Sequence, residues 1–335
     1  MRPVAVIGGG GWGTTLAIRF ATRGSGARLW LRESELVERM LERRDNPVYL
    51  PGITIPESVT PTSRLDEALE GAELIVGVVP SQYARAVYVA MAEAVGTGVP
   101  VVLATKGIEE ETLALPVDVA REILGGDRGY AVLSGPSFAA EVARGLPTAL
   151  VVASENAELG ERIQTLLSGD SLRVYTNRDV VGVQLAGALK NVIAIAAGIL
   201  DGLGMGHNTL AALLTRGLAE VTRLGLALGG RPSTFSGLAG VGDLVATCTG
   251  GLSRNRHVGQ ALGRGEILKE IVSHSSGVAE GIRTTRAARE LAQRAGVEMP
   301  IVEEMYRILY EDRSPGEASA HLMSRPLISE DGGPS

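Results

Sequence analysis

The stretch Val4-Ala5-Val6-Ile7-Gly8-Gly9-Gly10-Gly11-Trp12-Gly13 joins a short apolar run to a glycine-rich turn, and an amphipathic segment, Thr14–Arg23, follows directly. A strand, a G-x-G-x-x-G turn and a helix in this order are typical of a dinucleotide-binding βαβ unit. Gly8 permits the tight turn, Gly10 lets the backbone approach a pyrophosphate, and Gly13 allows helix and strand to pack closely. Without the flanking strand and helix, the same glycines would indicate only a flexible turn.

The choice of cofactor depends on the end of the second predicted strand. An acidic residue about 20 residues after the glycine turn usually binds the ribose 2′-hydroxyl. Here Arg32 occupies that position and Glu33 follows it. A guanidinium stacks on adenine and pairs with a 2′-phosphate, so we predict that NADPH is preferred, while Glu33 keeps NADH possible. The alternative for Arg32 is a solvated surface charge.

Beyond this unit, apolar runs alternate with helical patterns through the first half of the chain. Continuously apolar strands are typical of a parallel sheet covered on both faces, so we predict an N-terminal α/β doubly wound (Rossmann-type) sheet. The expected strands are Val4–Gly8, Ala27–Leu31, Leu74–Val79, Val99–Ala104, Tyr130–Ser134, Thr148–Ala153 and Leu172–Tyr175, and the expected helices between them are Thr14–Arg23, Gln82–Val95 and Leu113–Leu124.

From about Asn177 the strand patterns stop, and an all-α C-terminal region is predicted. We therefore expect a dinucleotide-binding domain over residues 1–177, an all-helical substrate and catalytic domain over 178–329, and a frayed tail over 330–335. The expected C-terminal helices are Asp179–Leu200, Asn208–Leu228, Ser253–Leu262, Glu280–Ala295 and Pro300–Tyr310.

Composition and charge exclude several classes of protein. The formal charge of −6 over 335 residues gives no basic stripe for nucleic acid. The longest apolar run, Val192–Leu200, is far shorter than the roughly 20 residues of a membrane span and is interpreted as a core helix. The single cysteine, Cys248, excludes an intrachain disulfide and fits a reducing compartment. The four histidines lack metal-ligand spacing, so no metal is predicted.

Unusual residues follow three of the predicted strands. Pro80-Ser81 ends one strand, Lys106-Gly107 ends the next, and Gly135-Pro136-Ser137 ends a third. Ligands of doubly wound sheets bind outside the carboxyl ends of the strands. Three such loops on one rim therefore indicate a site, with Lys106 as the best candidate to hold a substrate charge.

Lys190 lies in a segment that is apolar nearly all round, so the helix is expected to be buried. Burial lowers the pKa of a lysine, which suits a group that donates and accepts a proton. Reduction of a carbonyl creates an alkoxide that needs such a donor. The alternative is a lysine that extends along the helix edge to water. Asp243, predicted to lie in a glycine-rich loop, either orients this lysine or is an ordinary turn aspartate.

An anion site is predicted where Ser253-Arg254-Asn255-Arg256 begins a helix. Ser253 is a favourable N-cap, but arginines in the first turn oppose the helix dipole. A bound anion reverses that penalty, because free N–H groups, the dipole and Arg254 then converge on it. This indicates a phosphorylated small-molecule substrate. A solvated basic turn is the alternative.

Taken together, these segments resemble bacterial NAD(P)-dependent glycerol-3-phosphate dehydrogenases over nearly the whole chain. The glycine motif alone is unspecific, but the combined set is highly specific. It comprises Gly8–Gly13 with Trp12, Ala104–Gly107, Ser134–Ala139, Leu189–Val192 with Asn191, Gly240–Leu244 with Thr247, and Ser253–Asn255.

The resemblance implies reversible reduction of dihydroxyacetone phosphate to sn-glycerol 3-phosphate in the cytoplasm, which supplies phospholipid synthesis. It implies Lys190 as the proton donor and acceptor, with Lys106 and Asp243 beside it. One residue departs from the family pattern: Gly11 replaces a common Ser or Ala, which should weaken phosphate binding only modestly. The implied substrate contacts are Lys106, Gly135, Ser137, Lys190, Asn191, Asp243, Thr247, Ser253, Arg254 and Asn255, and the implied cofactor contacts are Gly8, Gly10, Gly11, Trp12, Gly13, Arg32, Lys106, Ala139, Arg254, Val278 and Glu280.

Two other functions compete with this one. A related β-hydroxyacid or ketopantoate-type reductase would share the architecture, and Arg254 with Asn255 would then bind a carboxylate. A non-catalytic NADPH-binding sensor would have no use for the buried Lys190. A homodimer is compatible with the sequence, which does not determine the oligomeric state, feedback regulation or physiological direction.

Overall fold

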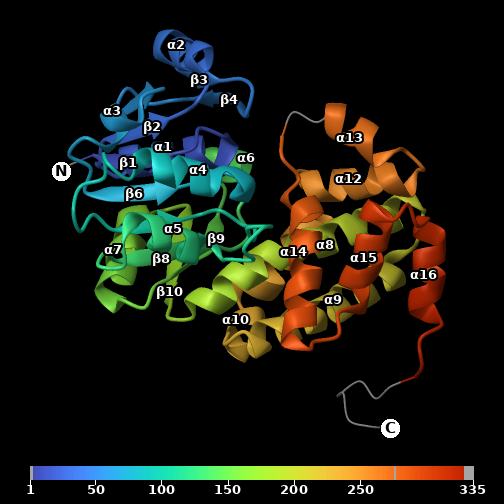
Figure 1. Ribbon diagram of the computed structural model, residues 1–335. Helices are drawn as coiled ribbons and strands as arrows, with labels where there is room; N and C mark the ends of the chain where they lie inside the picture. The colour runs from blue at the N-terminus through green and yellow to red at the C-terminus, as the bar shows by residue number, and fades with distance from the viewer. Residues whose placement is uncertain (1–2, 275–276, 328–335) are drawn as a thin grey trace.

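The computed structural model describes residues 3–274 and 277–327 and contains a sheet-based half followed by a helical half (Figure 1). The main sheet has eight strands in the order β10-β9-β8-β7-β6-β1-β2-β5. This arrangement confirms the predicted fold class. The strands are β1 (Val4–Ile7), β2 (Ala27–Trp30), β5 (Val59–Thr62), β6 (Leu74–Gly77), β7 (Val101–Leu103), β8 (Tyr130–Ser134), β9 (Thr148–Ala153) and β10 (Leu172–Asn177).

Strand β1 lies at the centre of the sheet, between β2 and β6 and parallel to both. All four of its residues are fully buried because helices cover both faces. Residues of α1 and α7 pack on one face, and residues of α3, α4 and α5 pack on the other. The helices of this half are α1 (Gly11–Thr22), α2 (Ser34–Arg43), α3 (Leu65–Leu69), α4 (Ser81–Met91), α5 (Pro116–Leu124), α6 (Ala139–Ala143) and α7 (Ala157–Leu167).

The prediction of a parallel sheet is wrong at one position, because β9 pairs antiparallel with β8. A parallel return requires a crossover, usually a helix, that runs back along the strand. The connection contains only the five-residue helix Ala139–Ala143, about 7.5 Å long at 1.5 Å per residue. Strand β8, with five residues, spans roughly 16 Å. The chain therefore turns back beside β8 in the opposite direction.

A small antiparallel hairpin, β3 (Asp45–Asn46) with β4 (Leu50–Thr54), lies outside the main sheet and was not predicted. Its strands are too short and too rich in proline and glycine to show a period of two. The hairpin nevertheless contacts α1 and α6, which places it beside the glycine-rich turn.

The helical half is built around α8 (Val180–Gly202), of which residues from Val183 to Ile199 are buried throughout. This confirms the interpretation of the apolar run as a core helix. By length and composition α8 is the one helix of the described residues that could cross a membrane, yet 94% of its apolar window is buried inside the protein. The other elements are α9 (His207–Ala227), α10 (Pro232–Phe235), the π-helical turn Leu238–Gly242, α11 (Asp243–Thr249), α12 (Arg254–Gly263), α13 (Leu268–His274), α14 (Glu280–Ala295), α15 (Pro300–Tyr310) and α16 (Pro315–Met323).

Several predicted boundaries differ from the structure. The helix predicted over Leu113–Leu124 begins only at Pro116, because Leu113 adopts a left-handed φ of 64° that ends any earlier helix. The helix predicted from Gln82 ends at Met91 rather than Val95. Strands end at Asn177 and helices follow, but division into domains at that residue stays a proposal. The predicted tail, 330–335, lies outside the described residues.

Candidate functional site

The glycine-rich turn between β1 and α1 has the tight geometry that its sequence predicts. Gly8 has a φ of 120°, and a Cβ there would lie 2.8 Å from the carbonyl oxygen of Val78. A Cβ on Gly13 would lie 1.8 Å from the carbonyl oxygen of Gly8. On Gly10, by contrast, a Cβ would meet no atom of the described residues within 4 Å. Two glycines are therefore required by the fold, whereas Gly10 faces open space in front of the helix N-terminus.

The start of α1 is enclosed by two other segments. Thr15 donates its hydroxyl to the carbonyl of Ala139, at 3.1 Å, which brings α6 against α1. A Cβ on Gly11 would lie 2.6 Å from the carbonyl oxygen of Tyr49 in the hairpin. A side chain at Gly11 would therefore collide with the hairpin, a reason for glycine at this position that the sequence did not reveal. Trp12 is partly buried, and its indole N–H is buried without a hydrogen-bond partner in the described part of the chain.

Arg32 lies just after β2, at the predicted position. Its side chain is 80% exposed and forms a loose ion pair with Glu33, at 3.6 Å. Both interpretations of Arg32 made from the sequence, a 2′-phosphate contact and a solvated charge, are compatible with this exposure.

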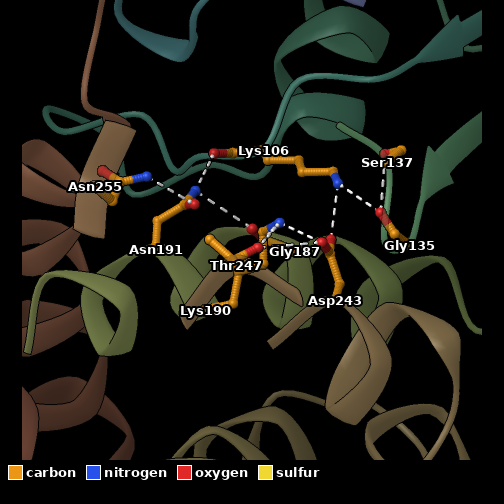
Figure 2. Close-up of polar contacts among 9 residues, drawn as sticks. All are labelled: Lys106, Gly135, Ser137, Gly187, Lys190, Asn191, Asp243, Thr247 and Asn255. Atoms are coloured by element: carbon orange, nitrogen blue, oxygen red, sulfur yellow. Dashed lines mark hydrogen bonds and ion pairs between the residues drawn. The ribbon is translucent and has the colours of Figure 1, made fainter. Parts of the chain in front are cut away.

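The rim of the sheet brings the predicted loops together. Lys106 follows β7 and donates to the carbonyl of Gly135, at 3.0 Å, in the loop after β8. Gly135 has a φ of 116°, which a residue with a side chain rarely adopts. Ser137 donates its hydroxyl to the same carbonyl, at 2.9 Å. Lys106, Gly135 and Ser137 thus form one contiguous group (Figure 2).

The helical half contributes a buried aspartate that binds two lysines (Figure 2). Asp243 accepts a hydrogen bond from Lys190 through Oδ1 and another from Lys106, at 2.7 Å, through Oδ2. Lys190 also donates to the hydroxyl of Thr247, at 2.7 Å. The side chains of Lys190 and Asp243 are only 8% and 2% exposed. Lys190 therefore does not extend to water along the helix edge.

Asp243 was predicted in a glycine-rich loop, and this placement is wrong. It is the first residue of α11, after a π-helical turn in which Gly240 has ψ −105°. The kink at Gly240 separates two helical segments, and the α11 register then aims both Asp243 and Thr247 at α8. Because Asp243 binds two cations from other elements, it is not an ordinary turn residue.

Burial and charge set the proton affinities of this cluster. Burial lowers the pKa of Lys190 to about 8; the nearby carboxylate of Asp243 opposes that effect and Lys106 adds to it. Burial alone would raise the pKa of Asp243, but the two ammonium groups outweigh it and hold the pKa below its ordinary value. Asp243 therefore stays ionised while Lys190 exchanges a proton near neutral pH. The predicted lowering of the Lys190 pKa is confirmed.

A chain of amides links the cluster to two further helices. Asn191 donates to the backbone carbonyl of Lys106, at 3.2 Å, and accepts from Asn255 on α12, at 3.0 Å. Asn255 in turn accepts from the N–H of Gly281 on α14, at 2.9 Å. Asn191 and Asn255 are both buried, so these bonds hold α8, α12 and α14 in one arrangement around the lysines.

The predicted anion site has the expected helix start. Ser253 caps α12 by accepting from the N–H of Arg256, at 3.2 Å. The Arg254 side chain lies close to Gly277: a Cβ on Gly277 would lie 2.6 Å from Nη1 of Arg254. Arg254 is exposed on the first turn of the helix. The sequence thus located the helix start correctly, while ligand binding there stays a proposal.

Glu280 and Val278 belong to the segment that leads into α14. Glu280 accepts from the N–H of Ser81, at 2.8 Å, and from its hydroxyl, so the segment is fastened to the start of α4. Burial raises the pKa of Glu280, an effect that Ser81 and Arg254 partly oppose. Val278 is half-buried two residues earlier. The partnership of Ser81 with Glu280 was missed, because 199 residues separate them and no motif joins them.

Two cavities lie elsewhere in the molecule. One of about 250 Å³ is open to solvent and lined by residues of α14, α15 and α16, and the other, about 550 Å³, is an open hollow lined by α7, β10 and the loops before β9 and β10. Neither is lined by a residue of the lysine–aspartate cluster. Within residues 3–274 and 277–327, no group of three His, Cys, Asp or Glu side chains could hold a metal ion.

Models of one protein family match both the sheet-based half and the helical half of the chain. Residues 3–160 match the model of the NAD-dependent glycerol-3-phosphate dehydrogenase N-terminus, and residues 179–320 match that of its C-terminus. A glycerol-3-phosphate dehydrogenase (NAD(P)+) of Koribacter versatilis is 52% identical, with 98% of this chain and 99% of the relative covered. The corresponding protein of Geobacter sulfurreducens is 51% identical, with 98% of both chains covered.

Solved structures show the same similarity in three dimensions. The crystal structure of glycerol-3-phosphate dehydrogenase from Coxiella burnetii superposes with a TM-score of 0.93 at 42% identity, covering 97% of this chain and 99% of that one. A ketopantoate reductase from Ralstonia eutropha gives a TM-score of 0.62 at 15% identity, covering 95% and 99%. This second match shows a shared fold alone.

Proposed function

The chain belongs to the NAD-dependent glycerol-3-phosphate dehydrogenase family, and from this membership we propose that Lys190 is its proton donor and acceptor. It is an NAD(P)-dependent oxidoreductase that interconverts dihydroxyacetone phosphate and sn-glycerol 3-phosphate. The observation that carries the catalytic proposal is the buried Asp243, whose two oxygens bind Lys190 and Lys106.

The chemistry follows from the charges at this cluster. The nicotinamide cofactor supplies or takes up the hydride when it is bound. The Lys190 ammonium stabilises negative charge at the carbonyl oxygen and gives that oxygen its proton. Asp243 fixes the position of Nζ and favours its charged form. Lys106, partly exposed beside Gly135, places a second cation where the substrate enters.

We propose that the substrate phosphate lies at the start of α12. The Ser253 cap uses the N–H of Arg256, and no hydrogen bond within the described residues involves the N–H groups of Arg254 and Asn255 in this first turn. An anion at this end would also offset the unfavourable interaction of Arg254 with the helix dipole. The further substrate contacts that we propose are Gly135, Ser137, Asn191 and Thr247, which the hydrogen bonds of Figure 2 join to the lysines.

For the cofactor we propose the turn Gly8–Gly13 as the pyrophosphate site. Gly10 faces open space there, and Trp12 and Ala139 border the start of α1. We propose NADPH as the preferred cofactor, because the exposed Arg32 is available to a 2′-phosphate. Arg254, Val278 and Glu280 would border the nicotinamide side.

The setting of the reaction is also a proposal. We place the enzyme in the cytoplasm, supplying glycerol phosphate for phospholipids, and propose a homodimer. A sensor without catalysis does not explain why two lysines are held on a buried carboxylate. A ketopantoate-type reductase shares only the fold with this chain.

An assay of the four combinations of cofactor and carbonyl substrate tests the proposed substrate and the proposed cofactor preference. Purified protein is given NADH or NADPH with dihydroxyacetone phosphate or ketopantoate, and cofactor oxidation is followed at 340 nm. We expect turnover with dihydroxyacetone phosphate and a higher kcat/KM with NADPH than with NADH. Arg32→Ala should reduce the NADPH value and leave the NADH value nearly unchanged. Equal loss with both cofactors would reject the assignment of Arg32 to the 2′-phosphate.

A further inference from the structure

Asn46, in the hairpin beside the glycine-rich turn, is a buried polar residue whose contacts the proposed mechanism leaves unexplained. Its side chain is 1% exposed. The amide nitrogen donates to the carbonyl oxygen of Gly9, at 3.0 Å, and to the hydroxyl of Thr14, at 2.9 Å. The amide oxygen accepts from the N–H of Tyr49, at 3.2 Å. One side chain thus connects the hairpin, the turn and the first turn of α1.

The bond to Gly9 orients a peptide unit of the turn. In a trans peptide the C=O of one residue and the N–H of the next point in opposite directions. Asn46 and the Thr14 hydroxyl both donate to the Gly9 carbonyl and hold it toward the protein interior. The N–H of Gly10 therefore points the other way, into the open space in front of α1. None of the hydrogen bonds within the described residues uses this N–H.

The hydrogen bond between Asn46 and the N–H of Tyr49 fixes the position of the hairpin beside the start of α1. The Tyr49 carbonyl oxygen lies 2.6 Å from the point that a Cβ on Gly11 would occupy, so the hairpin touches the backbone of α1 directly. Asn46 holds the hairpin at this distance through the Tyr49 N–H. The Asn46 amide therefore affects two features of the space in front of α1. One is the position of the hairpin beside it, and the other is the direction of the Gly10 N–H.

We propose that Asn46 is a positioning residue for cofactor binding, which aims the Gly10 N–H at the pyrophosphate through the Gly9 carbonyl. This inference rests on the cofactor site proposed above. Asn46 itself does not touch the cofactor. Its two donors and one acceptor are all in use within the protein, so its effect is transmitted through the turn and the hairpin.

The test is an equilibrium titration of the full chain, without substrate, with two ligands. NADP+ carries the pyrophosphate, whereas 2′-AMP carries the adenine and 2′-phosphate but no 5′-phosphate. For Asn46→Asp, which keeps the shape but replaces the donor by a carboxylate, we expect the Kd for NADP+ to rise about tenfold to hundredfold. The Kd for 2′-AMP should change by less than about twofold.

A neighbouring variant is the matched control. Asp45→Asn removes the ion pair with Arg39 at the base of the same hairpin, at 3.0 Å, but not the bonds to Gly9 or Thr14. We expect its Kd values for both ligands to stay near those of the unmodified chain. Should Asn46→Asp fold poorly, Thr14→Val removes the second donor to Gly9 in a similar shape and should weaken NADP+ alone, by a few-fold.

Hydrogen exchange gives a readout that is independent of any ligand. In the protein without cofactor, amides of the segment 8–14 should exchange faster in Asn46→Asp than in Asp45→Asn. Equal Kd values for NADP+ in Asn46→Asp and the unmodified chain would overturn the inference, as would equal losses for NADP+ and 2′-AMP. If the unmodified chain binds neither ligand, the cofactor site itself is overturned.

Discussion

Lys190 is fixed by two side chains of α11, and this determines what its replacement should do. Lys190→Met keeps the volume of the buried side chain but removes the transferable proton and the charge at the carbonyl oxygen. We expect kcat to fall about a thousandfold, the usual range for losing a general acid, while NADP+ binding stays within about twofold. Stopped-flow turnover and equilibrium titration measure the two quantities. Near-normal turnover in this variant would contradict the role assigned to Lys190.

The pKa of Lys190, lowered to about 8 by burial, predicts opposite pH dependences for the two directions. Below this pH the ammonium is present and can donate, so the rate of reduction should fall as pH rises through about 8. Oxidation requires the neutral amine, so its rate should rise over the same range. Initial rates in both directions between about pH 6 and pH 10 test this.

Two variants should move that midpoint in opposite directions. Asp243→Asn removes the carboxylate that raises the pKa of Lys190, so the midpoint should shift to lower pH. Lys106→Met removes a like charge that lowers it, so the midpoint should shift to higher pH. Both variants should also lose activity at every pH. The direction of each shift, read from kcat profiles, distinguishes electrostatic coupling from a general loss of structure.

At the scale of elements, glycines bring α8 and α12 into backbone contact. A Cβ on Gly259 would lie 2.0 Å from the carbonyl oxygen of Ile195, and one on Gly198 would lie 2.0 Å from that of Arg256. This close approach sets the distance between Asn191 on α8 and Asn255 on α12, which are hydrogen-bonded at 3.0 Å. The separation of the helices is therefore part of the site.

Gly259→Ala should consequently destabilise the protein by about 3 kcal/mol or more, since backbone cannot move aside as a side chain can. Gly316→Ala on α16 is the control, because among the described residues nothing lies within 4 Å of a Cβ at this position. Alanine favours helix, so that variant should be neutral or slightly stabilising. Urea denaturation measures both, and equal stabilities would show that the two helices separate without cost.

At the scale of the whole molecule, the two halves share one hydrophobic core. The cluster on one face of the sheet includes Ile7 and Leu103 together with Val183 and Leu189 of α8. Polar contacts also cross between the halves, such as Gln184 accepting from the N–H of Val117, at 2.8 Å. A shared core favours cooperative unfolding of both halves.

The distribution of tryptophans makes this testable. Trp12 and Trp30 are the only two tryptophans, and both lie in the sheet-based half. Far-UV circular dichroism, by contrast, reports mainly the helices that dominate the second half. We expect denaturation midpoints from fluorescence and circular dichroism to coincide. Separate midpoints would mean that residues 1–177 and 178–329 unfold independently, as two autonomous domains.

Local patterns were sufficient for much of this molecule. The turn Gly8–Gly13, the apolar strands beside it and the apolar helix around Lys190 each carry a signal within about 20 residues. Continuous apolar runs predict burial on both faces, and glycine spacing predicts the close approach of strand and helix. Ser253 likewise marks a helix start through its own side chain. These features were predicted correctly because short-range physics determines them.

The features that local patterns did not predict involve residues far apart in the chain. Asp243 was assigned to a loop because its glycines suggest one, whereas it begins α11 directly after the kink at Gly240, and α11 packs against α8 with the carboxylate bonded to Lys190. The direction of β9 followed from the short α6, and the hairpin contact of Asn46 left no periodic signal. The sequence specifies which residues carry charge and where glycines allow a wide range of backbone conformations. Packing brings the ammonium groups of Lys106 and Lys190 to the buried carboxylate of Asp243. These contacts depend on the distance between the side chains in space and not on their separation in the sequence.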